Sequence, residues 1–152
     1  MLSGFSDPNI QYCRQCRRCV FLWKDFVTGY HRSRACAELL NSALINYRYS
    51  SQAIPYDEVF KLDAFCRKTD LLIVFSVSSS IYENLARTLH DSQQKPEMLL
   101  ITCSKKNEMA KFFDHVIVLP DRKTIQSSYA LESAITNLFF INLLAMRLHT
   151  QK

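Results

Sequence analysis

The segment Asp70-Leu-Leu-Ile-Val-Phe-Ser-Val-Ser-Ser-Ser-Ile-Tyr-Glu83 decides the fold of this chain. Its first part, Leu71 to Phe75, is a continuous apolar run, which is typical of a strand buried on both faces. Four serines follow (Ser76, Ser78, Ser79 and Ser80), and an amphipathic helical pattern begins near Ile81. This arrangement predicts an anion site, because the first turn of a helix has unpaired N–H groups and a favourable dipole. A serine-rich loop that only caps the helix is the alternative.

The same alternation of apolar runs and helical patterns continues along the chain. Strands are expected at Arg18–Trp23, Asn46–Ser50, Leu71–Phe75, Met98–Thr102 and His115–Leu119. Helical patterns cover 33–45, 56–67, 81–90, 105–113 and the chain from about Ser128 onward. Apolar strands that alternate with helices are typical of an α/β fold with a five-stranded parallel sheet covered on both faces, a three-layer αβα sandwich.

The composition is that of a single globular domain. The 152 residues carry a net charge of +5, and 48% of them are hydrophobic. We expect residues 1–17 to be a polar leader or linker and 18–152 to be one domain. No signal peptide is recognisable, and the apolar stretch Leu138 to Leu148 is too short to span a bilayer. We therefore expect a cytoplasmic protein without a membrane partner, and the mild positive charge is a weak argument for nucleic-acid binding.

Cysteine and glycine usage narrows the possible chemistry. Cys13-x-x-Cys16-x-x-Cys19 has a spacing that suits a metal, but no motif supplies a fourth ligand, so we expect no metal. The other three cysteines, Cys36, Cys66 and Cys103, fall in apparent helices or strands, which favours buried free thiols. With only two glycines in the chain, no glycine-rich nucleotide-binding loop is present. We expect no cofactor.

The last helix has almost no polar face between Leu138 and Leu148. A helix that is apolar all round is buried on all sides, which one small domain rarely achieves with its terminal helix. This pattern predicts a homodimer with the helix at its interface. A helix packed deep against its own sheet is the alternative.

Three segments together resemble the sugar isomerase (SIS) domain, and most of all the effector domain of RpiR-type transcriptional regulators. The first is 70–83, which is similar to the family's strand followed by Ser-x-Ser-Gly-x-Thr. The second is Met98-Leu-Leu-Ile-Thr-Cys-Ser104 with Met109-Ala-Lys-Phe-Phe-Asp-His-Val-Ile-Val-Leu-Pro120, and the third is Ser127-Ser-Tyr-Ala-Leu-Glu-Ser-Ala-Ile135. The resemblance covers the chain from Arg18 to its end.

The resemblance implies a flavodoxin-like fold, a homodimer and a sugar phosphate bound at the carboxyl ends of the strands. It places Ser76, Ser78, Ser79 and Ser80 at the phosphate, with Glu132 near the sugar hydroxyls. The family carries a small loop after its first strand, whereas this chain has Leu22-Trp-Lys-Asp-Phe26 at the place expected for it. Trp23 and Phe26 are bulky there, and Asp25 would repel a phosphate if it faced the crevice. Lys24 is expected to supply a compensating positive charge.

Three functions are compatible with the resemblance. The first is a sugar-phosphate sensor without catalysis, the effector domain of an RpiR-type regulator. DNA binding would then come only from a helix-turn-helix domain, for which the residues before Arg18 are too few. The second is an SIS-type sugar-phosphate isomerase, which needs a base; Glu83, Glu132, His31 and His90 are candidates without an evident partner, so we assign no catalytic residue. The third is a dimerisation module whose ligand site has decayed.

Overall fold

The computed structural model describes residues 24–76, 80–120 and 129–150, and the side chains of Ser80 and of residues 129–133 lie outside that description. The strands are β1 (Asp25–Gly29), β2 (Ser51–Ile54), β3 (Leu71–Phe75), β4 (Glu97–Thr102) and β5 (His115–Val118). The α-helices are α1 (Arg32–Asn46), α2 (Leu62–Phe65), α3 (Glu83–Asp91) and α4 (Tyr129–Thr150). Three 3₁₀ helices complete the fold: η1 (Tyr56–Lys61), η2 (Ser80–Tyr82) and η3 (Glu108–Phe112).

The five strands form one parallel sheet in the order β2-β1-β3-β4-β5. This is the flavodoxin-like order, in which the chain moves outward from β1 to β2 and then returns to place β3 on the other side of β1. Gly29 at the end of β1 pairs with Phe75 at the end of β3. The expected αβα sandwich with five parallel strands is therefore confirmed.

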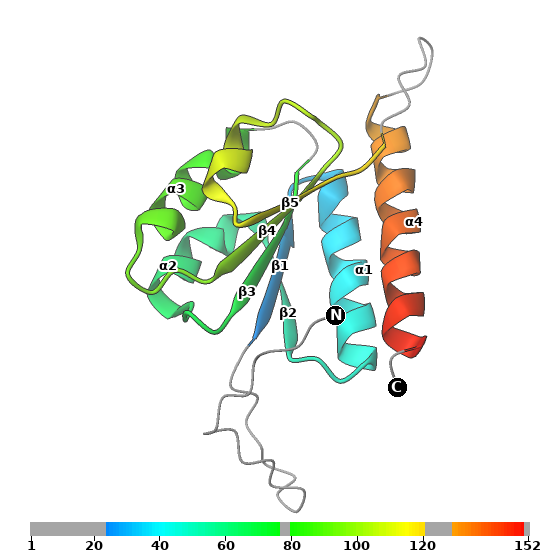
Figure 1. Ribbon diagram of the computed structural model, residues 1–152, viewed down its shortest axis with the longest axis horizontal. Helices are drawn as coiled ribbons and strands as arrows, with labels where there is room; N and C mark the ends of the chain where they lie inside the picture. Colours follow the sequence, from blue (N-terminus) through cyan, green and yellow to red (C-terminus); the bar gives the residue numbers. More distant parts are fainter. Residues whose placement is uncertain (1–23, 77–79, 121–128, 151–152) are drawn as a thin grey trace, which may run out of the picture.

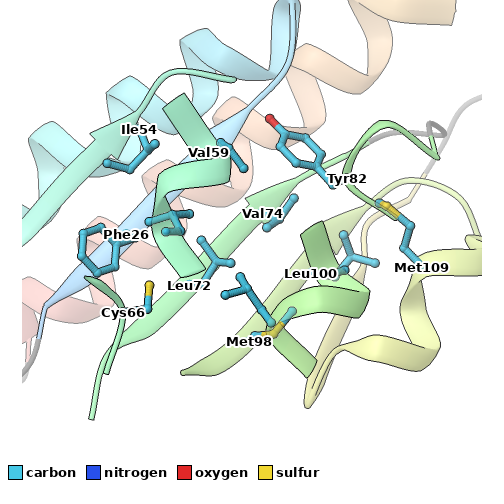
Figure 2. Packing of buried hydrophobic residues seen from close by; sticks show 13 residues of the cluster. Phe26, Ile54, Val59, Cys66, Leu72, Val74, Tyr82, Met98, Leu100 and Met109 are labelled. Carbon is cyan, nitrogen blue, oxygen red and sulfur yellow. The ribbon is translucent and has the colours of Figure 1, made fainter. Parts of the chain in front are cut away.

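Helices cover the sheet on both faces and bury two apolar cores. In Figure 1, α1 and α4 lie side by side on one face, and α2 and α3 lie on the other. Figure 2 shows the core on the α2/α3 side, where Tyr82 packs with side chains from the central strands such as Leu72, Val74 and Leu100. The opposite core joins Val27 and Phe75 to the inward face of α1.

The sequence pattern located most of these elements correctly. β3 matches the expected strand residue for residue, and α1 covers the helix expected at 33–45 and buries Cys36, Ala37, Leu40 and Leu44. Cys36, Cys66 and Cys103 are buried free thiols, as expected. Cys13, Cys16 and Cys19 lie outside the described residues, as does the expected leader, residues 1–17. None of the helices in the described part of the chain has the length and hydropathy that crossing a bilayer requires.

The first two strands are displaced from their expected positions. β1 occupies Asp25–Gly29, whereas the sequence pattern placed the first strand at Arg18–Trp23 and treated Lys24 to Phe26 as part of the loop after it. β2 occupies Ser51–Ile54 rather than Asn46–Ser50. Phe26 is consequently a buried core residue of β1 and does not crowd the loop at the carboxyl end of the sheet.

Helix α4 has an inward face and an exposed apolar face. Ile141 is buried, and Phe140, Leu144 and Leu148 pack against the core beneath the helix. The opposite face exposes five large apolar side chains, each between 42% and 64% accessible: Ile135, Leu138, Phe139, Leu143 and Met146. The homodimer with this helix at its interface, expected from the sequence, therefore stays a prediction.

Candidate functional site

Polar side chains gather at the carboxyl edge of the sheet, where β1, β3 and β4 end. This edge contains the point at which the strand order reverses between β1 and β3, and ligands of open parallel sheets bind at such points. Three segments follow the central strands at this edge: Tyr30–His31 after β1, Ser76 after β3 and Cys103–Ser104 after β4. These three short segments frame the candidate site.

The segment after β3 begins with a buried serine. Ser76 is only 4% exposed, and its backbone N–H donates to the Ile101 carbonyl oxygen at 3.0 Å, which ties the end of β3 to β4. Ser78 and Ser79 lie outside the described residues, and Ser80 begins η2, which leads directly into α3. The strand, serine segment and helix therefore succeed one another as the sequence predicted. The role of the four hydroxyls in holding a ligand stays a prediction.

The segment after β4 is held by a small polar network. Thr102 is 1% exposed, and its hydroxyl oxygen accepts from the Ser104 N–H at 3.1 Å and from Asn107 Nδ2 at 3.3 Å. Asn107 Oδ1 in turn accepts from the Met109 N–H at 3.1 Å and caps η3. These bonds fix the loop after β4, whose preceding strand is hydrogen-bonded to Ser76, as a preformed ligand site requires.

Aromatic side chains lie at the carboxyl edge of the sheet, on the side of β1 and β2. Thr28 Oγ1 donates to the Ile54 carbonyl at 2.9 Å and lies 3.2 Å from the Tyr82 hydroxyl, which is then the donor of that second bond. Burial raises the pKa of Tyr82 to about 12, so this phenol stays neutral and serves as a hydrogen-bonding group rather than a base. The Tyr56 ring contacts the rings of Tyr82 and Tyr30, with centroids 5.5 and 4.6 Å away. Tyr56 and Tyr82 also line an open groove of about 460 Å³ between η1 and α3.

The candidate bases are spread through the structure. His31 is exposed at the carboxyl edge, where its ring packs against Tyr30. Glu83 accepts a 2.9 Å hydrogen bond from Arg87, and His90 lies late on α3 beside the Asp91 carboxylate. Glu132 falls in the first turn of α4, and its side chain is outside the described residues. The described contacts of these residues join none of them into a pair suited to proton transfer.

Lys24 lies at the wrong edge of the sheet for the role expected of it. It precedes β1, and its backbone N–H donates to Asp70 Oδ1 at 2.9 Å, directly before β3 begins. Its ammonium group donates to Gln52 Oε1 on β2. Because all strands run parallel, residues before β1 and residues after β3 are at opposite ends of the sheet, so Lys24 does not share a site with Ser76 in one chain.

Sequence reasoning missed the residues at the end of β1 and directly after it. With the first strand placed too early, Thr28 was assigned to the loop after the strand rather than to the strand itself, and Ser33 was not considered as part of the ligand edge. Gly29 was the available signal, because it is the only glycine between Gly4 and the C-terminus and lies directly before a helical pattern. A Cβ atom at Gly29 would lie 2.3 Å from the Ser33 carbonyl oxygen, so the first turn of α1 rests on the end of β1.

The thiols and acidic groups of the described residues suggest neither a metal nor a nucleophile. Within those residues, no three or more His, Cys, Asp or Glu side chains are grouped so that they could hold a metal ion. Burial raises the pKa of the Cys66 thiol to about 12, and it also raises the pKa of Cys36. Thiols with a raised pKa are weak nucleophiles at neutral pH.

Comparison with known proteins supplies structural matches. No family model matches the chain, and no curated protein matches it. The sugar isomerase domain of an RpiR transcription factor from Sphaerobacter thermophilus is similar, with a TM-score of 0.65, 20% identity, and coverage of 84% of this chain and 72% of that one. A Methanococcus jannaschii protein, inferred to be a 3-hexulose-6-phosphate isomerase, is also similar. Its TM-score is 0.62 at 19% identity, with coverage of 84% of this chain and 70% of that one.

A third similar structure contains a ligand. It is the Vibrio vulnificus NanR protein complexed with ManNAc-6P, with a TM-score of 0.71, 13% identity, and coverage of 85% of this chain and 49% of that one. The likeness to all three is one of fold. The chain has the fold of sugar isomerase (SIS) domains, which confirms the resemblance found in its sequence.

Proposed function

We propose that this chain is a sugar-phosphate-binding SIS domain that senses its ligand without catalysis, as the effector domain of an RpiR-type transcriptional regulator. The carrying observation is that β3 delivers Ser76 to the strand-order switch point, where η2 and α3 begin. Similar structures include an RpiR sugar isomerase domain and NanR with ManNAc-6P, which supports this ligand class.

The phosphate ester would be held by the serine segment. Ser76, Ser78, Ser79 and Ser80 supply hydroxyl donors, and the N–H groups at the start of η2 and α3 supply backbone donors. Thr102, Ser104 and Asn107 follow the part of β4 to which Ser76 is bonded and would position the sugar. Glu132 would contact sugar hydroxyls, whereas Lys24 takes no part because it lies at the opposite edge.

The direct test is calorimetric titration with a panel of hexose and amino-sugar phosphates. Each hydrogen bond to a charged oxygen contributes about 1.5–3 kcal/mol, so the Ser76→Ala, Ser78→Ala double variant should bind roughly a hundredfold more weakly or worse. Ser42→Ala is the matched control, because Ser42 is an exposed serine on α1 whose hydroxyl donates to the Glu38 carbonyl. Negligible heats for every ligand would favour a decayed dimerisation module, and tight binding by the double variant would place the site elsewhere.

An isomerase is the second candidate, and the exposed imidazole of His31 at the carboxyl edge favours it. Aldose–ketose isomerisation needs a group that moves a proton next to the sugar carbonyl, and histidine is suited to that task at neutral pH. A coupled assay for interconversion of each sugar phosphate that binds separates the two functions. Turnover that is lost in His31→Gln while binding persists would support the enzyme, whereas binding without turnover supports the sensor.

We also propose that the domain is a homodimer that covers the exposed face of α4. The five apolar side chains on this face have helical spacing and form one continuous stripe. A second copy of the same chain carries the same stripe, so a two-fold interface would bury both at once.

A further inference from the structure

An apolar run of the sequence ends just before β1 and does not belong to that strand. Val20-Phe-Leu-Trp23 was expected to form part of the first strand, but β1 begins at Asp25. Consecutive large apolar side chains are favoured in contact with other apolar surface, because their removal from water is the main favourable contribution to folding. We therefore expect an apolar surface of the domain to cover this run.

The described part of the chain contains such a surface at the amino end of the sheet. An open hollow of about 590 Å³ lies where β3, β4 and β5 begin. Leu71, Leu99 and Ile117 line it, and all three are only partly buried, on the face of the sheet that α1 and α4 cover. The two helices therefore leave this part of the face open.

The chain passes the hollow as it enters β1. The Lys24 N–H donates to Asp70 Oδ1 at 2.9 Å, and the Lys24 carbonyl accepts from the Leu71 N–H at 3.1 Å. In Figure 1, β1 and β3 begin side by side at the same end of the sheet. Because Leu71 lines the hollow, Trp23 is bonded directly to a residue at its border. A segment attached so closely has a high effective concentration at the hollow.

The charges of the hollow and of the preceding segment are complementary. The hollow is bordered by Glu97 and Asp114, and the Glu97 side chain is exposed. The apolar run follows Arg17 and Arg18, and residues 8–24 contain no acidic side chain. An apolar segment that follows arginines matches an apolar hollow with an acidic border.

We propose that the apolar run at 20–23 occupies this hollow in its own chain, with Arg17 and Arg18 at the acidic border. Side-chain alternation along β1 supports this placement. Val27 belongs to the core on the α1/α4 side, and the same alternation directs position 23 to that side, where the hollow lies. The hollow is at the end of the sheet opposite to the candidate ligand site, so the inference does not depend on the proposed function.

The fluorescence of Trp23 tests the proposal on the full chain, because Trp23 is the only tryptophan present. We expect its emission at shorter wavelength than in the urea-unfolded chain, and weaker quenching by acrylamide, since an indole in the hollow is shielded from water. Emission and quenching equal to those of the unfolded chain would overturn the proposal.

A charge on the floor of the hollow should release the segment. Ile117→Lys is expected to move the emission of Trp23 to longer wavelength, towards that of the unfolded chain. Val118→Lys is the matched control, because Val118 is the next residue of β5, faces the other side of the sheet and is 44% exposed. Equal shifts in the two variants would contradict a site at Ile117.

A change at the border gives a second test that leaves the floor intact, and it decides the matter if circular dichroism shows that Ile117→Lys does not fold. Glu97→Lys should increase the quenching of Trp23, because it repels the arginines. Glu58→Lys is its control: both glutamates are exposed members of an ion pair, with His115 and Lys61, but Glu58 lies in η1. Quenching that is unchanged in Glu97→Lys would count against the proposal.

The remaining outcomes identify a different location or a different copy. A shielded Trp23 that responds to neither Ile117→Lys nor Glu97→Lys is buried elsewhere, and the proposal is then wrong. The emission should also be independent of protein concentration. A shift to longer wavelength on dilution would mean that Trp23 is covered by, or covers, a second copy of the chain, and would overturn docking within one chain.

Discussion

At the scale of single residues, Gly29 links the sheet to the candidate site. The Ser33 carbonyl would lie 2.3 Å from a Cβ atom at this position, and the Ser33 carbon and Arg34 nitrogen are nearly as close. All three are backbone atoms, which cannot move aside as the end of a flexible side chain can. The close approach of α1 to β1, and with it the position of Ser33, depends on the absence of a side chain here.

Gly29→Ala should therefore destabilise the fold by about 2 kcal/mol or more, in the range found for overpacked cores. Urea denaturation measures this change, with Ser42→Ala on the exposed side of α1 as a control that should stay within about 0.5 kcal/mol. A stable Gly29→Ala variant would show that α1 does not rest on β1 as described.

Asp25 is a residue whose charge opposes folding. It lies at the start of β1, and burial, together with a smaller repulsion from Asp70, raises its pKa from 3.8 to about 6. Between these two values the folded chain binds a proton that the unfolded chain does not, so this carboxyl makes stability fall as the pH rises from about 4 to about 6.

Asp25→Asn should consequently stabilise the protein at pH 7 and have little effect at about pH 3, where the aspartic acid is largely protonated in both states. Urea denaturation at the two pH values tests this, and Asp57→Asn, on exposed η1, provides the comparison. A gain that is the same at both pH values would contradict the assigned cause.

At the scale of elements, continuous apolar runs predicted strands correctly, whereas a strand that mixes polar and apolar residues was missed. β3 and β4 are almost wholly apolar, and both were located from the sequence. β1 reads Asp-Phe-Val-Thr-Gly, and the more apolar run at 18–23 was taken for the strand instead. Thr28 is fully buried there because the Ile54 carbonyl and Tyr82 hydroxyl satisfy it, and these partners are 26 and 54 residues away.

The errors in the predicted site follow from the misplaced first strand. The serine segment was found because its signal is local: a strand, hydroxyls and a helix in immediate succession. Lys24 was misassigned, and Ser33 was overlooked, because their relation to the ligand edge depends on where β1 lies. A local pattern therefore identifies the loop after a strand only when the strand itself is placed correctly.

Within α4, Asn137 is a polar residue in an apolar setting. It is 3% exposed, and its side-chain oxygen is buried without a hydrogen-bond partner among the described residues. An unpaired buried acceptor costs about 1–3 kcal/mol, so Asn137→Leu should raise the free energy of unfolding by about 1 kcal/mol. Urea denaturation at fixed protein concentration measures it, and Asn84→Leu at an exposed position of α3 is the control. Equal changes in the two variants would mean that Asn137 has a partner after all.

At the scale of the whole molecule, the outer face of α4 bears on whether the chain is a monomer or a dimer. A helix with one polar and one apolar face can bury its apolar face within a single domain. The outer face of α4 is also apolar, and the side chains of Phe139 and Met146 are 64% and 59% exposed there. Contiguous apolar surface of this kind marks an interaction site. Leu144 packs inward against the core, so a charge there would test folding rather than association.

Phe139→Glu is the informative change, because it places a charge at the centre of the exposed stripe without touching the core. We expect the wild type to sediment as a dimer at micromolar concentration and Phe139→Glu to sediment mainly as a monomer, since an unpaired charge buried in an interface costs several kcal/mol. Phe60→Glu is the matched control: Phe60 is 72% exposed in η1, which packs on the opposite face of the sheet, and the same substitution there should leave the dimer intact. A monomeric wild type, or equal dissociation in both variants, would show that the outer face of α4 is not where two copies meet.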